Sequence, residues 1–198
     1  MDKNLKKEIF SIPNILSYFR IVLIPVFIVL FFNSNKGIGY HMAAAGVLIL
    51  SGLTDMLDGK IARKFNQITE LGKIIDPVAD KLTQCAIMIC LAMRYKLLWA
   101  FIGVLVIKEI TMAILALLFL KKGRKLKGAH WYGKVSTTVF YLVMTVLLAI
   151  PPSKMPYELS TALILISGAF MVFAFIMYVR VYFSMGRDIR DNKPNKRY

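Results

Sequence analysis

Only two cysteines and two histidines occur among the 198 residues of this sequence. Cys85 and Cys90 lie in one long apolar stretch, five positions apart, so they do not share a helix face. We interpret them as small buried hydrophobic residues. The sequence therefore predicts neither a disulfide nor a cysteine-based metal site. It also contains no convincing internal repeat and no low-complexity segment.

Polar residues are nearly missing from several long stretches, among them 21–32, 97–107 and 110–120, and the mean hydropathy is +0.61. A helix of roughly 20 apolar residues crosses a bilayer core about 30 Å thick. Six candidate spans follow, at 12–32, 38–54, 74–93, 97–120, 134–151 and 158–183. They leave little chain for a soluble domain. The expected fold class is all-α, an integral membrane bundle of six transmembrane helices in a single domain over residues 1–198.

The two ends of the chain are polar. The first ten residues are basic, and the apolar run after them is long enough to span, so we expect no cleavable signal peptide. We interpret 1–11 as a juxtamembrane segment in which 2–10 form a short amphipathic helix on the membrane surface. Residues 184–198 are expected to form a polar C-terminal tail.

Acidic residues are few, with 11 Asp and Glu against 26 Lys and Arg, which gives a net charge of +15. If six spans alternate from a cytoplasmic N-terminus, the inner segments hold 17 of the 26 basic residues and the outer loops hold four. The positive-inside rule then predicts a multi-pass protein of the cytoplasmic membrane with both termini in the cytoplasm. Because the charges are dispersed between apolar spans, we expect anionic lipids and phosphorylated substrates as partners, and no nucleic acid.

Four of the few acidic residues cluster at the inner ends of two spans. Asp55 and Asp58 end the second span, and Asp76 and Asp80 begin the third. Positions three or four apart share a helix face, so each helix presents two carboxylates. A short connection is expected to bring the two pairs together at one membrane depth.

Four carboxylates in a partly dry site repel one another unless they are neutralised. One interpretation is a salt-bridged lock between the helices, with nearby cations at Lys60, Arg63, Lys73 and Lys81. The other is a pair of divalent ions, since Asp is the hard oxygen donor suited to Mg²⁺ or Mn²⁺. Gly59 and Gly72 favour the second, because glycine lets a bulky ligand approach the backbone. Two clustered metal ions suit reactions at phosphorus.

The segment 55–80 carries a recognisable pattern. It reads D55-M-L-D58-G59-K-I-A62-R63, then eight residues, then G72-K-I-I-D76-P-V-A-D80. This resembles the signature of the CDP-alcohol phosphatidyltransferase family at every fixed position. Eight fixed residues over 26 positions make a chance match negligible, and the length and six spans are also similar to the family.

The resemblance implies transfer of a phosphatidyl group from CDP-diacylglycerol to an alcohol, with release of CMP. It implies that Asp55, Asp58, Asp76 and Asp80 hold two divalent ions, Mg²⁺ or Mn²⁺, and that Asp80 is also the general base. It further implies a homodimer, and a CDP-lipid site at Thr54, Gly59, Ala62, Arg63 and Gly72.

The surrounding residues resemble the branch of the family whose acceptor is glycerol 3-phosphate. An anionic acceptor needs cations, and the candidates for its phosphate are Lys81, Lys134 and Arg180; snorkelling to lipid headgroups is the alternative for the last two. Two departures weaken this assignment: Lys108 stands where the branch commonly has Arg, and Ser136 where it often has Lys.

Rival functions follow from the same residues. A sister transferase would use phosphatidylglycerol, giving cardiolipin, or inositol phosphate as its acceptor. A cation carrier would place acids at several depths, whereas these four lie near one face. Among single residues, we expect His41 at an outer surface and Glu109 paired with Lys108 or Lys81. Asn14 could cap the first span or contact the nucleotide, and we expect the cap.

Overall fold

The computed structural model describes residues 10–65, 69, 71–121 and 131–190. The expected amphipathic helix at 2–10 lies almost wholly outside the described residues. Over the described ranges the chain is helical and contains no strand. The all-α prediction is confirmed.

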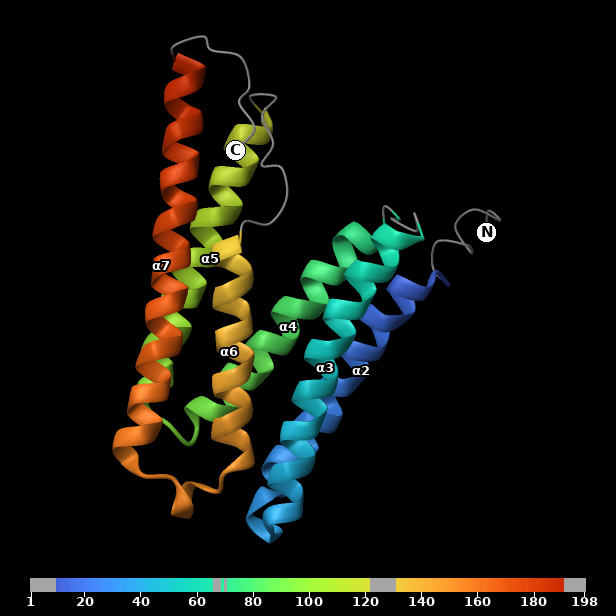
Figure 1. Ribbon diagram of the computed structural model, residues 1–198, viewed down its shortest axis with the longest axis vertical. Coiled ribbons are helices and arrows are strands. Elements are labelled where there is room, and N and C mark those ends of the chain that lie inside the picture. The colour runs from blue at the N-terminus through green and yellow to red at the C-terminus, as the bar shows by residue number, and fades with distance from the viewer. Residues whose placement is uncertain (1–9, 66–68, 70, 122–130, 191–198) are drawn as a thin grey trace. The chain divides into compact units, whose positions relative to one another are not determined.

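Six long helices follow in order, with two short 3₁₀ turns between them (Figure 1). Their bounds are α2 Ile12–Phe32, η1 Ser34–Lys36, α3 Ile38–Lys64, α4 Gly72–Ala92, α5 Leu97–Lys121, α6 Trp131–Ala149, η2 Pro152–Lys154 and α7 Tyr157–Arg190. All six coincide with predicted spans. Two of them are longer: α3 continues ten residues past position 54, and α7 includes 184–190 of the predicted tail. Polar residues end a membrane span without ending a helix, because hydropathy and helical propensity are separate properties.

Five of these helices are long and apolar enough to cross a membrane. The shortest, α6, has 19 residues and extends about 28 Å at 1.5 Å per residue, close to the thickness of a bilayer core. The helix that does not meet this criterion among the described residues is α4, whose first half carries Asp76, Asp80 and Lys81. Several apolar helices make this a multi-pass membrane protein, and α4 contributes its charged end to the site described below.

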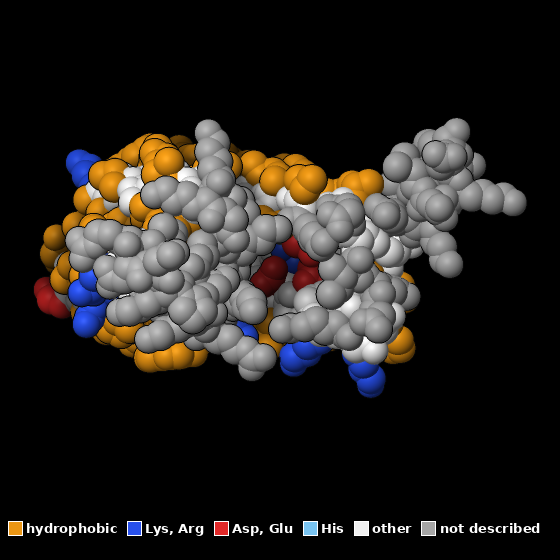
Figure 2. Space-filling model, turned by 90° about the horizontal axis from the view of Figure 1, so that it is seen from above, with side chains coloured by type: hydrophobic (Ala, Val, Ile, Leu, Met, Phe, Trp, Pro, Cys, Tyr) orange, Lys and Arg blue, Asp and Glu red, His pale blue; other side chains and the backbone are white. Residues whose placement is uncertain are grey.

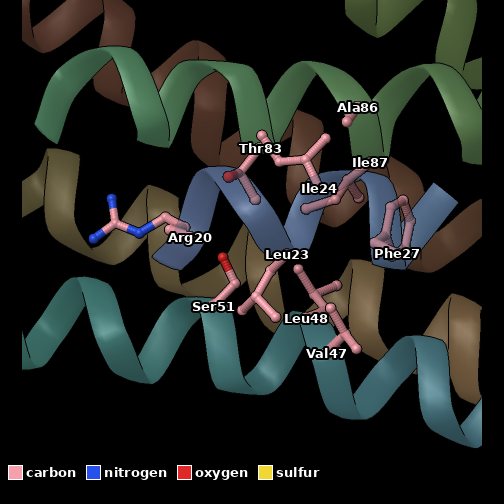
Figure 3. A pocket seen from close by; sticks show the side chains of 10 residues that line it. All are labelled: Arg20, Leu23, Ile24, Phe27, Val47, Leu48, Ser51, Thr83, Ala86 and Ile87. Atoms are coloured by element: carbon pink, nitrogen blue, oxygen red, sulfur yellow. The ribbon is translucent and has the colours of Figure 1, made fainter. Parts of the chain in front are cut away.

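The helices form two compact units. The first contains α2, α3 and α4, up to Tyr95, together with residues 144–156; the second contains 96–143 and the chain from 157 onward. Within the first unit, α2 packs against both α3 and α4 and lies between them, while α3 and α4 have few close contacts with each other over the described residues (Figure 3). The first unit is thus organised around α2.

The packing face of α2 changes character along its length. Its buried residues recur at helical spacing: Pro13, Asn14, Ser17, Arg20, Leu23, Phe27 and Phe31. The second half of this stripe is apolar. The first half is polar, and it lies at the end of the unit where α2 and α4 begin and α3 ends. We call this the aspartate end, because all four predicted aspartates belong to the adjoining turns of α3 and α4.

The opposite end of the first unit is joined by Arg94. Its guanidinium lies 4.0 Å from the centre of the Phe31 ring, donates to Ser34, and lies 3.5 Å from His41 Nδ1. Burial lowers the pKa of Arg94 below its usual value. His41 itself is 5% exposed and lies 3.2 Å from the carbonyl oxygen of Leu148. The prediction of a surface histidine was therefore wrong.

The second unit is built on close contact between α5 and α7. A Cβ on Gly168 of α7 would fall 1.7 Å from the ring of Phe101 on α5, so only glycine admits that ring. The rings of Phe119 and Tyr182 meet further along, 5.3 Å apart. Apolar side chains elsewhere on α5, including Ile107 and Leu117, are more than half exposed. A helix that is apolar on all sides is expected in lipid.

Both cysteines of the described chain are free thiols, as predicted. Cys90 is buried and Cys85 is exposed, so the prediction that both are buried was right for Cys90 only. In a membrane helix an exposed thiol is compatible with lipid contact, because Cys behaves as a small hydrophobic residue.

Candidate active site

The aspartate end contains a cation that the sequence argument did not consider. Arg20 of α2 is fully buried, with 0% of its surface exposed. Its Nη1 lies 2.9 Å from Asp55 Oδ1, and its Nη2 donates to Asp58 Oδ2. The side chain of Asp58 is 4% exposed and that of Asp55 is 39% exposed. A buried carboxylate needs a paired charge, and Arg20 supplies it.

A signal for Arg20 was present in the sequence. It is the single charged residue of α2, and a charge inside a membrane span is expensive enough to indicate a function. The salt-bridge interpretation named Lys60, Arg63, Lys73 and Lys81 because these are near the aspartates in sequence. The cation that pairs with two of them comes instead from a helix 35 positions earlier than Asp55.

The second pair of aspartates is also held from α2, in part. Ser17, one turn before Arg20, donates a hydrogen bond to Asp76 Oδ1 and lies 3.1 Å from the carbonyl oxygen of Pro13. Asp80 has neighbours on its own helix. Gln84 Nε2 donates to Asp80 Oδ2 over 3.3 Å, and Lys81 Nζ lies 4.0 Å from the same oxygen.

Asn14 fixes the beginning of α4. Thr69 donates to Asn14 Oδ1 over 3.2 Å, and the backbone N–H of Gly72 donates to Thr69 Oγ1 over 2.9 Å. A Cβ on Gly72 would fall 2.6 Å from Asn14 Oδ1. Asn14 was expected to cap α2, but it is a buried residue inside that helix. The space left by Gly72 is used here by the Asn14 side chain.

The four aspartates are close enough to act on one another. Asp55 lies within electrostatic range of Asp76 and Asp80, and Asp58 within range of Asp55 and Asp76. Figure 2 shows acidic side chains gathered on the face at this end of the helices. The two pairs thus lie near each other at the aspartate end, although α2 stands between α3 and α4.

The donor set suits a hard divalent ion in chemistry. All four groups are carboxylates, the ligands that Mg²⁺ and Mn²⁺ prefer. In the arrangement described, no three Asp, Glu, His or Cys side chains of the described residues converge closely enough to hold one ion. Arg20 accounts for this in part, because its guanidinium already engages one oxygen of Asp55 and one of Asp58.

A small cavity adjoins the site along α2 (Figure 3). Its volume, counted as the space open to the centre of a water molecule, is about 10 Å³. This is roughly the room that one water molecule needs. Its lining is mostly apolar, with polar side chains from each of the three helices: Arg20, Ser51 and Thr83. Figure 3 shows the guanidinium of Arg20 extending away from the apolar lining.

The residues expected at the CDP-lipid lie on the last turns of α3 and the first of α4. Thr54 is buried and donates to the carbonyl oxygen of Ser51 over 2.8 Å. Gly59 and Ala62 follow on the same helix and are half-buried. The side chain of Arg63 lies outside the described part of the structure. Nothing in the geometry tests nucleotide binding by these residues, which stays a prediction.

The cations expected to bind the acceptor phosphate belong to different units. Lys81 is in the first unit, beside Asp80. Lys134 of α6 and Arg180 of α7 are both exposed and belong to the second unit. Their joint role at one phosphate stays a prediction. Lys108 and Glu109, also of the second unit, form an ion pair of 3.0 Å, which confirms the expected partner of Glu109.

Four carboxylates, of which only Asp58 is buried, lie at one end of a unit of apolar helices, at the spacing of the pattern of residues 55–80. The sequence profile of the CDP-alcohol phosphatidyltransferase family matches residues 10–184, and this chain belongs to that family. The resemblance predicted from the motif is confirmed, and the chain is an enzyme of this class. Enzymes of the family generally depend on a divalent metal.

Several relatives share the name CDP-diacylglycerol--glycerol-3-phosphate 3-phosphatidyltransferase. That of Pseudomonas fluorescens is 33% identical over 176 residues, which cover 86% of this chain and 89% of the relative. That of Escherichia coli strain K12 is 30% identical over 173 residues, covering 86% of this chain and 93% of the relative. The similarity extends over nearly the whole length of both proteins.

Proposed function

We propose that this protein transfers the phosphatidyl group of CDP-diacylglycerol to glycerol 3-phosphate, giving phosphatidylglycerophosphate and CMP in phospholipid biosynthesis. The observation that carries the proposal is the set of four aspartates at one end of the first unit, in a chain whose family transfers phosphatidyl groups. The acceptor is inferred from the names of relatives that match almost end to end.

We propose that Asp55, Asp58, Asp76 and Asp80 together hold two divalent ions, Mg²⁺ or Mn²⁺. The carboxylate donor set and the electrostatic proximity of the four groups support this assignment. Such ions would spread the charge of the transferring phosphoryl group and stabilise CMP as it leaves. The helices α3 and α4 keep the two pairs of donors rigid, since each pair is spaced along one helix face.

Asp80 is proposed as the general base. It accepts the proton of the acceptor hydroxyl as that oxygen forms a bond to the lipid phosphorus, and the bond from phosphorus to the CMP oxygen breaks. A carboxylate is a weak base, so the hydroxyl must be held in line with the leaving group. Gln84 and Lys81 orient the Asp80 carboxylate from one turn of the same helix. Asp80 is thereby distinguished from the two aspartates that Arg20 engages.

Two substrate subsites complete the proposal. The CDP-lipid is assigned to Thr54, Gly59, Ala62, Arg63 and Gly72, next to the metal-holding carboxylates in sequence. The acceptor phosphate is assigned to Lys81, Lys134 and Arg180, because an anion needs cationic donors. We further propose that the enzyme is a homodimer in the cytoplasmic membrane, with its termini and active site on the cytoplasmic side, as the excess of basic residues in the inner segments favours.

The acceptor is tested by measuring CMP release from CDP-diacylglycerol by the purified protein with Mg²⁺ or Mn²⁺. The panel is glycerol 3-phosphate, inositol phosphate, phosphatidylglycerol and no acceptor. We expect release with glycerol 3-phosphate alone. Release only with inositol phosphate or phosphatidylglycerol would assign the chain to a sister transferase, and no release with any acceptor would contradict the proposed reaction altogether.

A further inference from the structure

Arg20 carries a positive charge into the centre of the first unit with no exposure to solvent. Removing a guanidinium from water is expensive unless it is paired, so its position requires the carboxylates of Asp55 and Asp58. These are two of the four groups proposed above as metal ligands. Two cations therefore compete for the same pair of carboxylates. One is the Arg20 guanidinium, and the other is a divalent ion from solution.

The guanidinium and the divalent ion repel each other when both contact these carboxylates. A guanidinium at hydrogen-bond distance from a carboxylate and a divalent ion on the same carboxylate lie only a few ångströms apart. The repulsion is large where water is excluded, and Asp58 is 4% exposed. Asp55 is the more accessible partner at 39% exposure, so its ion pair with Arg20 is the one that a solvated ion reaches first.

The environment of Arg20 also leaves the guanidinium incompletely bound. Its Nε and Nη1 are buried with no hydrogen-bond partner of suitable geometry among the described residues, although Nη1 is near Asp55. Ser51 Oγ, which lines the same cavity, is in the same condition. A fixed structural ion pair is normally satisfied on all its donors. Here two of the donors remain available to a water or to a shifted position.

We propose that Arg20 is a positioning residue that acts as the resident counter-charge of the metal site. In the absence of metal it holds Asp55 and Asp58 in place. When a divalent ion binds, it replaces Arg20 at Asp55, while the hydrogen bond to the buried Asp58 oxygen is kept. Arg20 thus preserves the folded site without metal and lowers its affinity for metal. This inference rests on the proposed function, since it takes both aspartates as metal ligands.

The test compares Mn²⁺ binding and thermal unfolding of the full-length protein in detergent, without substrates. Free Mn²⁺ is measured from its electron paramagnetic resonance signal. Arg20→Met removes the charge, and Arg20→Gln removes it while keeping a hydrogen-bonding side chain. Leu23→Ala, one turn further along the buried stripe of α2, is the control for loss of stability without loss of charge.

Both neutral Arg20 variants are expected to melt at a lower temperature than the wild type without metal, and to gain more from Mn²⁺ than the wild type does. Their affinity for Mn²⁺ should rise by on the order of tenfold. An adjacent guanidinium weakens proton binding at a carboxylate by about one to three powers of ten, and it repels a divalent cation in the same sense. Leu23→Ala should melt earlier with its Mn²⁺ affinity unchanged, and Arg20→Lys should bind Mn²⁺ as weakly as the wild type.

The inference is overturned if the neutral variants bind Mn²⁺ no more tightly than the wild type, or if neither variant folds even with saturating Mn²⁺. A failure of the proposed function looks different. In that case Asp58→Asn leaves Mn²⁺ binding unchanged in the wild type and in every Arg20 variant.

Discussion

At the scale of single residues, the four aspartates have separate surroundings that suggest separate tasks. Asp55 and Asp58 are engaged by Arg20, Asp76 by Ser17, and Asp80 by Gln84 of its own helix. The first three are anchored from α2. Gln84 and Lys81 of the same helix contact the Asp80 carboxylate, which we propose as the general base.

Replacing Asp80 by Asn removes the base and keeps the shape of the side chain. We expect turnover to fall by at least about 10²-fold, while CDP-diacylglycerol still binds. CMP release measures the first, and ligand-induced thermal stabilisation measures the second. Glu158→Gln, an exposed acidic residue at the start of α7, is the matched control and should keep full turnover. Substantial turnover in Asp80→Asn would count against the base, and loss of binding would make Asp80 chiefly a metal ligand.

Gly72→Ala tests the close approach of α4 to α2. The added methyl would lie 2.6 Å from Asn14 Oδ1 and 2.9 Å from Thr69 Oγ1, so one of these side chains must move. We expect a loss of about 1 to 3 kcal/mol in stability, measured by thermal unfolding. Gly103→Ala on α5, where a Cβ meets nothing within 4 Å, is the control. Equal melting temperatures for the two variants would show that the contact is easily relieved.

The sequence predicted which aspartates share a helix face but not the residues that contact them, for a physical reason. Helical periodicity tells which residues share a face, so the pairing of Asp55 with Asp58 and of Asp76 with Asp80 follows from spacing alone. It does not tell which other helix meets that face. Arg20 and Ser17 were therefore missed, although a lone charge in an apolar span already marked Arg20 as unusual.

At the scale of elements, α2 is the organising helix of the first unit. It packs on α3 and on α4, and it separates the two helices that carry the catalytic motif. The apolar parts of the helices were predictable because runs of bilayer length are hard to misread, whereas the polar ends of α3 and α7 were not. The order of packing was not, since consecutive helices joined by a short connection are usually neighbours. Here α3 and α4 both pack on α2.

Arg94 is expected to fasten the far end of this arrangement. Arg94→Met keeps the length of the side chain but removes its contacts with the Phe31 ring, Ser34 and His41. We expect a loss of about 1 to 2 kcal/mol, seen as a lower melting temperature. The proposed metal site lies at the other end of the first unit, so Mn²⁺ affinity should be unchanged. A variant as stable as the wild type would contradict the fastening role.

At the scale of the whole molecule, composition determines more than any single contact does. Long apolar helices with lipid-compatible exposed faces make a membrane protein, and the distribution of basic residues favours an active site on the cytoplasmic side. In the proposed reaction the lipid substrate comes from the membrane, and the acceptor and CMP are water-soluble.

Removing divalent ions should stop the enzyme completely and reversibly. Treatment with EDTA is expected to abolish CMP release, because no other group in the proposed mechanism stabilises the phosphoryl charge to the same degree. Adding Mg²⁺ or Mn²⁺ in excess of the chelator should restore it, while Ca²⁺, a larger ion that prefers more ligands, should restore it less. Full activity in EDTA would contradict the role assigned to the four aspartates.

The central claim is that the protein transfers a phosphatidyl group to glycerol 3-phosphate at a site formed by these four carboxylates. Its most direct test is mass-spectrometric detection of phosphatidylglycerophosphate made by purified protein in vesicles with CDP-diacylglycerol, glycerol 3-phosphate and Mg²⁺. The account predicts this product from the wild type, and little or none from single Asn variants of Asp55, Asp58, Asp76 and Asp80. Absence of the product from the wild type, or undiminished product from those four variants, would contradict it.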